Sequence, residues 1–219
     1  MTPGRFITVE GGEGTGKTTQ ARRLHEWLGA RDIEAVLTRE PGGTVEAEEI
    51  RRLLVEGPAE RWEPLTETLL HVAARRVHLD RAILPALRAG TWVVCDRFAD
   101  STMAYQGYGL ELGPAVVADI HDLVIGDLAP DLTVVLDMPV AGALSRLVRR
   151  GGELDRYEAR DRAFHQRVRD GFRAIAAAAP ARCHLLDADR GADALADAIA
   201  RLVDARLVRA RATGAAHGG

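Results

Sequence analysis

Five short segments of the chain are largely apolar runs without polar alternation, and they alternate with longer segments in which apolar residues recur every three or four positions. The apolar segments are predicted strands at residues 5–10, 34–38, 91–95, 132–136 and 183–186. The longer ones are predicted helices at residues 17–28, 45–55, 65–87, 115–124, 140–150, 159–179 and 192–208. Pro85 is expected to kink the third of these helices or to split off its last turn. The glycine-bearing stretch 97–114 is predicted to be a loop.

Strands that are largely apolar, each separated from the next by helices, are typical of a parallel sheet covered on both faces. The pattern therefore predicts an α/β fold. No internal repeat or linker interrupts it, so residues 1–210 are predicted to form a single domain. The tail 211–219 lacks periodicity and is expected to be flexible.

Composition adds few constraints. The chain has 219 residues and a formal net charge of -3, with 47% hydrophobic and 28% charged residues, which is typical of a globular protein. The charge calls for neither a nucleic-acid nor a membrane partner. We see no membrane-spanning run and no signal-peptide pattern, and we expect a cytoplasmic protein. Cys95 and Cys183 are predicted core residues, because no cysteine spacing suggests zinc.

The strongest motif follows the first predicted strand. Residues 11–18 read GGEGTGKT, fit G-x-x-x-x-G-K-[ST] and lead into a helix, which is the context of a phosphate-binding loop (P-loop). Backbone N–H groups and the helix N-terminus would bind the phosphates of ATP, Lys17 would reach the outer ones, and the Thr18 hydroxyl would bind Mg²⁺. Lys17 is the chain's one lysine; all other members of its 29 Lys+Arg are arginine. The predicted ATP-binding residues are Gly11, Gly12, Glu13, Gly14, Thr15, Gly16, Lys17, Thr18 and Thr19.

The absence of asparagine from the sequence excludes two classes of P-loop protein. Guanine recognition by regulatory GTPases uses an Asn-Lys-x-Asp motif, and a protein kinase needs an asparagine in its catalytic loop, yet the chain contains no asparagine. Both classes are excluded. A non-catalytic ATP-binding subunit stays open, since it would need the P-loop alone.

Three further segments are expected near the carboxyl ends of the strands, where α/β sheets bind ligands. Two follow predicted strands directly, and the third follows the predicted helix 140–150. They are TREPGGT at 38–44, DRFADSTMAYQGYG at 96–109 and RRGGELDRYE at 149–158. Together with the P-loop they resemble bacterial thymidylate kinases, members of the P-loop nucleoside monophosphate kinases, from Phe6 to about Val203. The resemblance implies a five-stranded parallel sheet, a short lid at about 149–158, a homodimer, and phosphorylation of dTMP to dTDP by Mg-ATP, a step in dTTP synthesis.

The same resemblance suggests which residues bind the acceptor nucleotide. It implies that Arg39 and Arg97 bind the phosphate and that Arg75 and Thr102 read the base. Glu13 would accept from the 3′-hydroxyl of the sugar, and Tyr105 would pack on the sugar and disfavour ribonucleotides. Asp96, at the end of a strand beside the P-loop, is the expected second Mg²⁺ residue; the alternative is a carboxylate paired with a local arginine. The full predicted dTMP set is Glu13, Arg39, His71, Arg75, Arg97, Thr102, Tyr105 and Gln106.

Phosphoryl transfer needs positive charge on the moving oxygens, and this P-loop carries Thr15 where it could carry an arginine. The lid is therefore expected to supply the charge from among Arg149, Arg150 and Arg156. Arg150 is the favoured residue, with Arg146 and Arg149 as alternatives, and Gly151 and Gly152 would permit closure. The predicted catalytic residues are Lys17, Arg97, Arg150 and Glu13.

His71 departs from the family pattern, because relatives usually carry a phenylalanine that stacks on thymine. A histidine can stack, donate a hydrogen bond or become charged. A kinase for dUMP or a 5-modified pyrimidine nucleotide is therefore the second hypothesis.

Overall fold

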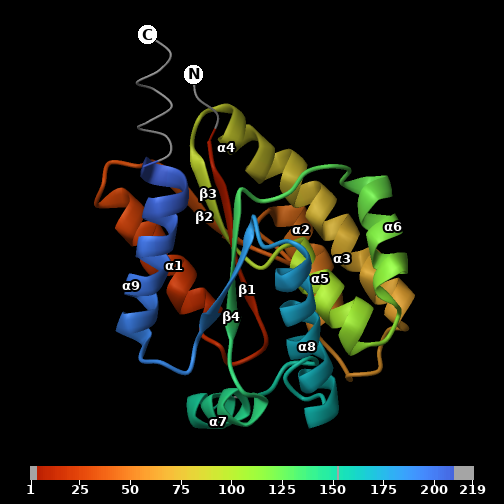
Figure 1. Ribbon diagram of the computed structural model, residues 1–219. Coiled ribbons are helices and arrows are strands. Elements are labelled where there is room, and N and C mark those ends of the chain that lie inside the picture. The colour runs from red at the N-terminus through yellow and green to blue at the C-terminus, as the bar shows by residue number, and fades with distance from the viewer. Residues whose placement is uncertain (1–3, 152, 210–219) are drawn as a thin grey trace.

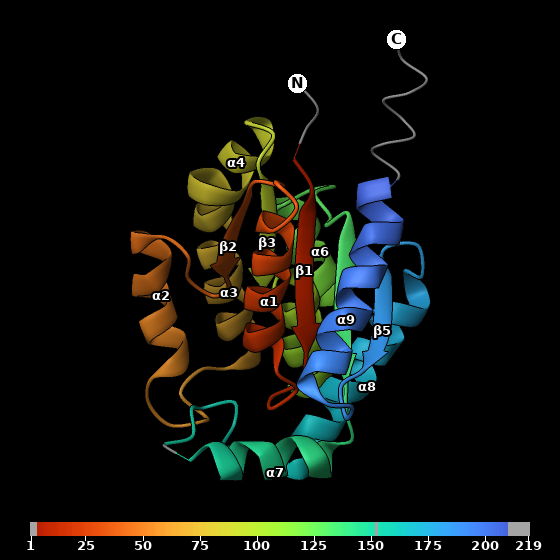
Figure 2. The same ribbon diagram turned by 90° about the vertical axis from the view of Figure 1, so that its left-hand side faces the viewer.

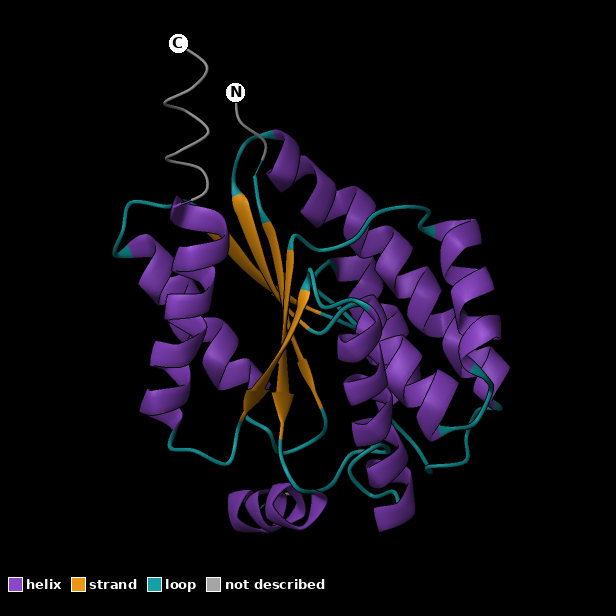
Figure 3. Ribbon diagram, in the orientation of Figure 1, coloured by secondary structure: helices purple, strands orange, loops and turns teal. Residues whose placement is uncertain are grey.

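Five parallel strands form the central sheet of the computed structural model, which describes residues 4–151 and 153–209 (Figures 1 and 3). Their order across the sheet is β2-β3-β1-β4-β5. Ile7 of the central strand aligns with Val94 on one side and Leu132 on the other. The bounds are β1 Phe6–Gly11, β2 Ala35–Arg39, β3 Trp92–Asp96, β4 Leu132–Asp137 and β5 Cys183–Asp187. The predicted α/β fold with a five-stranded parallel sheet is confirmed.

Helices cover both faces of this sheet, which explains why the strands are largely apolar and do not alternate with polar residues. All six residues of β1 and all five of β3 are buried, whereas Val36 and Leu37 of the edge strand β2 are partly exposed. Burial on both sides removes the need for alternating polar positions. Cys95 and Cys183 are buried in β3 and β5, as predicted.

One face is covered by α1 (Lys17–Gly29) and α9 (Ala192–Val203), which continues as the π-helical η3 (Asp204–Val208) (Figures 1 and 2). The other face carries α3 (Pro64–His78), α6 (Pro114–Val124) and α8 (Arg162–Ala178), while α2 (Val45–Val55) packs on α3. Helix α7 (Val140–Arg150) lies across the carboxyl ends of the strands. The carboxyl ends of the strands are therefore flanked by helices on both faces of the sheet and by α7.

The winding of the long third helix changes just before Pro85. Helix α3 runs without a break into the π-helical η1 (Leu79–Ile83) and then α4 (Leu84–Arg88). The Leu84 N–H donates to the Leu79 carbonyl, five residues back instead of four. Proline has no N–H to continue the normal ladder, so the wider turn lies immediately before it.

The prediction of a loop at 97–114 is wrong. Residues Ala99–Thr102 form helix α5, and Met103–Gly109 form the π-helical η2. The buried Glu10 carboxylate accepts hydrogen bonds from the Phe98 N–H (2.7 Å) and the Ser101 hydroxyl (2.5 Å), which fixes the start of this helix. Its glycines permit close packing: a Cβ on Gly109 would lie 2.7 Å from Val168 of α8. Sequence reasoning took these glycines for turn residues.

The remaining differences are small. Helix α8 begins at Arg162, three residues after the predicted start, because the Asp161 side chain accepts from the Phe164 N–H and caps it. Gly152 and the predicted tail 211–219 lie outside the described residues. Within residues 4–151 and 153–209 no helix has the length and apolarity to cross a bilayer.

Candidate functional site

The P-loop connects β1 to α1 at the carboxyl edge of the sheet. Gly14 has a φ of 71°, and a Cβ there would lie 2.3 Å from the carbonyl oxygen of Ala143 in α7, so glycine is required. The Lys17 ammonium donates to the Gly12 carbonyl at 2.6 Å, and the Thr15 hydroxyl donates to the same carbonyl at 2.9 Å. These bonds hold the loop around the space that phosphates would fill.

Lys17 is buried, and its burial changes its acidity. Burial lowers the pKa of Lys17 to about 8; the charge of Arg97 acts in the same direction, and Glu13 and Asp96 act against it. A phosphate placed in the loop would restore the preference for the ammonium form. The site is therefore built to hold this charge when an anion is present.

Thr18 and Asp96 meet beside the P-loop. The Thr18 hydroxyl donates to Oδ2 of Asp96 at 2.5 Å. The second carboxylate oxygen, Oδ1, is buried and has no hydrogen-bond partner among the described residues. Across those residues, no cluster of three or more histidine, cysteine or carboxylate side chains could enclose a metal by itself. One hydroxyl and one carboxylate with a free oxygen nevertheless fit Mg²⁺, which takes few protein ligands and fills its shell with water and phosphate.

Glu13, Arg97 and Tyr105 form a closed triad above Lys17. The Arg97 guanidinium donates to Glu13 at 2.6 Å and to the Tyr105 hydroxyl at 3.0 Å, and that hydroxyl donates to Glu13 at 2.8 Å. Burial alone would raise the pKa of Glu13, but the charges of Arg97 and Lys17 outweigh it and lower the pKa to about 2. Arg97 has a φ of 72°, a conformation unusual for a non-glycine residue, directly after β3. The tertiary structure thus directs this arginine into the site.

A buried network fixes Arg75 at the far end of the site. Its Nε donates to Glu40 at 2.7 Å, and its Nη2 donates to the Thr102 hydroxyl at 2.8 Å and to the Phe98 carbonyl at 3.0 Å. Glu40 also accepts from Nδ1 of the fully buried His78 at 3.0 Å. A carboxylate cannot donate, so the Nδ1 of His78 carries the proton. The network holds the guanidinium in one orientation.

His71 and Gln106 flank this end of the site. The Gln106 amide donates to Glu67 at 2.9 Å, and its carbonyl oxygen is buried with no partner in the described part of the chain. Nε2 of His71 lies 2.9 Å from the Tyr157 hydroxyl. Burial, followed by the charges of Arg75 and Arg97, lowers the pKa of His71 to about 3, so the ring is neutral.

Arg39 and Arg51 lie at the outer rim. Arg39 donates to Glu48 at 3.0 Å and is about half exposed, so it can leave that ion pair at low cost. Arg51 donates to the Pro41 carbonyl at 2.7 Å. Both contribute positive charge to a region that also contains Arg97.

The lid arginines fall into two groups. Arg150 is half exposed and makes a two-bond ion pair with Glu158, at 2.8 and 2.9 Å. Arg146 donates to the Ala188 carbonyl, and Arg149 is exposed on α7. Arg156 differs from the expectation: it is buried, paired with Glu67 at 3.0 Å, and donates to three backbone carbonyls. A guanidinium committed to that many partners is a structural group, not a mobile lid charge.

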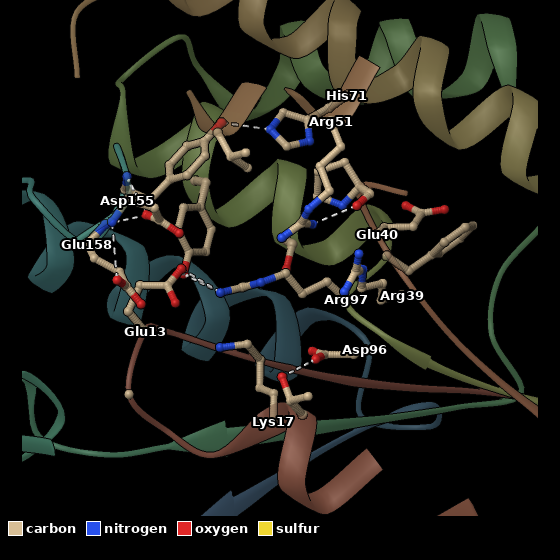
Figure 4. Close-up of a pocket in the computed structure, with 18 of the residues that line it drawn as sticks. Glu13, Lys17, Arg39, Glu40, Arg51, His71, Asp96, Arg97, Asp155 and Glu158 are labelled. Carbon is tan, nitrogen blue, oxygen red and sulfur yellow. Dashed lines mark hydrogen bonds and ion pairs between the residues drawn. The ribbon is translucent and has the colours of Figure 1, made fainter. Parts of the chain in front are cut away.

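One cavity of about 470 Å³ joins these groups. Figure 4 shows Lys17 and Asp96 at one end of it, Glu13 and Arg97 in the middle, and His71 at the other end. All eight residues predicted to bind the acceptor line this cavity, as do Arg146, Arg150 and the P-loop residues Gly14, Gly16, Lys17, Thr18 and Thr19. The predicted site residues Gly11, Gly12 and Thr15 are not in the lining, and neither are Arg149 and Arg156.

Sequence reasoning did not assign ten of the lining residues to the site, among them the polar Glu40, Arg51, Asp155, Tyr157 and Glu158. Glu40 lies inside the TREPGGT segment, and the last three lie inside RRGGELDRYE, so the segments were informative although these members were not singled out. Arg51 carries no such signal, because it belongs to an ordinary helical repeat.

Comparison with known proteins gives one family. A family model described as thymidylate kinase matches residues 9–199. A thymidylate kinase of Caulobacter vibrioides is 49% identical over 207 residues, covering 94% of this chain and 99% of the relative. One from Gluconobacter oxydans is 53% identical, covering 93% and 96%. The crystal structure of thymidylate kinase from Ehrlichia chaffeensis superposes with a TM-score of 0.72 at 37% identity, covering 92% of this chain and 99% of that one.

Proposed function

This chain belongs to the thymidylate kinase family, and from that premise we propose that it transfers the γ-phosphate of ATP to the 5′-phosphate of dTMP. The observation that carries the assignment of residues is the shared cavity. The P-loop and all eight candidate acceptor residues line one continuous space. Donor and acceptor phosphates bound at its two ends would meet between Lys17 and Arg97.

We assign the ATP phosphates to the P-loop. Its backbone N–H groups and the N-terminus of α1 supply fixed dipoles, and Lys17 supplies a mobile charge. Thr18 and Asp96 would hold Mg²⁺, which neutralises phosphate charge when bound. The unpartnered oxygen of Asp96 supports this assignment.

The acceptor nucleotide is assigned to the other end of the cavity. Arg97 and Arg39 match the phosphate oxygens. Glu13, already ionised, accepts from the 3′-hydroxyl, and the Tyr105 hydroxyl that Arg97 and Glu13 hold in place limits room for a 2′-hydroxyl.

The base is assigned to the buried end. Arg75 is held in one orientation by Glu40 and Thr102, and it lines the cavity. The unpartnered carbonyl oxygen of Gln106 can accept a hydrogen bond from a base N–H. A donor and an acceptor at this position match a pyrimidine edge that offers both a carbonyl and an N–H.

The reaction needs positioning and charge neutralisation more than proton transfer. An oxygen of the acceptor phosphate is already anionic, so no strong general base is required. Lys17 and Arg97 flank the transfer path, and Arg150, held by Glu158, supplies positive charge to the moving phosphoryl group. The Arg150 side chain is 53% exposed and that of Glu158 only 6%, so the pair fixes the guanidinium at the cavity while leaving it accessible to a ligand.

We further propose a cytoplasmic homodimer without a nucleic-acid partner. Helices α3 and α6 pack side by side and expose large apolar side chains, which supports an interface there. The side chains are Leu65, Leu69, Val116 and Leu123.

The test is ADP release with Mg-ATP against dTMP, dUMP, UMP, dCMP, CMP and GMP. The proposal expects turnover with dTMP well above every other acceptor. A preference for dUMP would keep the mechanism but change the substrate, with His71 as the first residue to examine. ATP binding without turnover on any acceptor would contradict the proposal and favour a non-catalytic protein.

A further inference from the structure

The Nε2 atom of His71 makes a hydrogen bond within the protein. Its Nε2 lies 2.9 Å from the hydroxyl of Tyr157, and the two rings are 6.1 Å apart at a tilt of 54°. Either the hydroxyl donates to Nε2 or Nε2–H donates to the hydroxyl, depending on the tautomer, but the contact occupies Nε2 in both cases. A phenylalanine at this position could not make it.

Tyr157 belongs to a tight turn that also carries the partner of Arg150. Oδ1 of Asp155 accepts from the backbone N–H groups of Tyr157 (2.8 Å) and Glu158 (2.9 Å), which fixes residues 155–158 as a unit. Glu158 in turn holds Arg150 through two bonds. A continuous set of hydrogen bonds therefore runs from α3 to the lid arginine.

The ring of Tyr157 also supports the sugar end of the cavity. It meets the Tyr105 ring edge-on with centroids 5.7 Å apart. His71, Tyr157 and Tyr105 thus form one side wall, with His71 at the base end and Tyr105 at the sugar end.

We propose that His71 and Tyr157 act as one hydrogen-bonded unit that positions the turn 155–158, and with it Arg150, over the acceptor. His71 is on this account a positioning residue and does not read the base by hydrogen bonding. The inference rests on the proposed dTMP kinase activity. It predicts that the pair affects kcat, because it acts through the placement of Arg150, and leaves the preference among bases unchanged.

Two nearly isosteric substitutions each remove one partner of the hydrogen bond; because the Tyr157 hydroxyl also interacts with Glu67, His71→Phe is the more selective of the two. His71→Phe keeps a flat ring and removes Nε2; Tyr157→Phe keeps the ring and removes the hydroxyl. Each should lower kcat for dTMP about five-fold, the effect of one neutral hydrogen bond, and the double variant should be no worse than either single one. The KM for ATP and the dTMP-to-dUMP ratio of kcat/KM should not change.

Tyr108→Phe is the matched control, because Tyr108 packs against Gly171 of α8 and does not line the cavity. Thermal unfolding of each variant is measured in parallel. Losses in His71→Phe and Tyr157→Phe that multiply in the double variant would overturn the proposal, as would a wild-type kcat in either. A changed base ratio in His71→Phe but not in Tyr157→Phe would show that His71 reads the base. If the wild-type enzyme itself does not turn over dTMP, the proposed function fails instead, and the two failures are distinguishable.

Discussion

Two arginines of the lid segment should differ sharply in their effect on stability: substitution of Arg156 should destabilise the fold strongly, and substitution of Arg150 only slightly. Arg156→Met removes the partner of a buried carboxylate: both Arg156 and Glu67 have side chains about 1% exposed. It also removes the donors to the carbonyls of Leu54, Pro58 and Ala59. Breaking such a buried pair from one side typically costs about 3–5 kcal/mol of unfolding free energy, because a charge is left without compensation.

Arg150→Ala is the comparison, since it also breaks an arginine–glutamate pair, but one whose arginine is half exposed, so water can replace the guanidinium beside Glu158. Its cost should be at most about 1 kcal/mol. For a domain of this size, each kcal/mol shifts the unfolding temperature by about 2–4 °C, so Arg156→Met should lower Tm by about 6–20 °C and Arg150→Ala by no more than about 4 °C.

The assay is urea and thermal unfolding of both variants followed by circular dichroism. Adding Glu67→Gln to Arg156→Met removes the stranded charge and should recover part of the loss. If Arg156→Met costs less than about 1 kcal/mol, or if both variants are equally destabilised, Arg156 is not the structural anchor described above and the separation of the lid arginines is wrong.

Four further outcomes follow from the site. Lys17→Met should reduce turnover by more than about 100-fold with the circular dichroism spectrum unchanged, and near-normal activity would refute the assigned role. Burial lowers the pKa of Lys17 to about 8, so the free enzyme loses this charge as the pH rises through that value, and kcat/KM for ATP should fall above it; a flat alkaline profile would refute this. Arg150→Ala should lower kcat by about 10²- to 10³-fold and change the KM for ATP far less, whereas the reverse pattern would count against it. Chelation by EDTA should stop turnover, and Asp96→Asn should raise the Mg²⁺ concentration needed for half-maximal rate; an unchanged requirement would remove Asp96 from the metal site.

Much of the fold could be predicted because burial on both faces leaves a direct mark on the strands. The apolar segments and the P-loop frame at Gly11–Thr18 needed no tertiary information. The helix at Ala99–Gly109 could not be predicted in this way. It begins where Glu10 of β1 accepts from Phe98 and Ser101, and that contact joins residues about 90 positions apart in sequence.

Site residues could be predicted when they lay inside a specific motif. They could not be predicted when their role depends on how deeply they are buried in the fold. Arg150 and Arg156 look alike in sequence, and only the buried Glu67 on α3 distinguishes them. The contact between His71 and Tyr157 likewise joins two segments 86 residues apart. The departure of His71 was visible in the sequence, but its partner was not.

The central claim is direct transfer of the γ-phosphate of ATP to dTMP in this cavity. The most direct measurement is incubation with Mg²⁺, dTMP and ATP labelled in the γ-phosphate, followed by separation of the products, with Lys17→Met in parallel. The account predicts labelled dTDP in equal amount to unlabelled ADP, and neither product from the variant. Label in free phosphate with dTMP unchanged would contradict it, because the protein would then hydrolyse ATP and not phosphorylate the nucleotide.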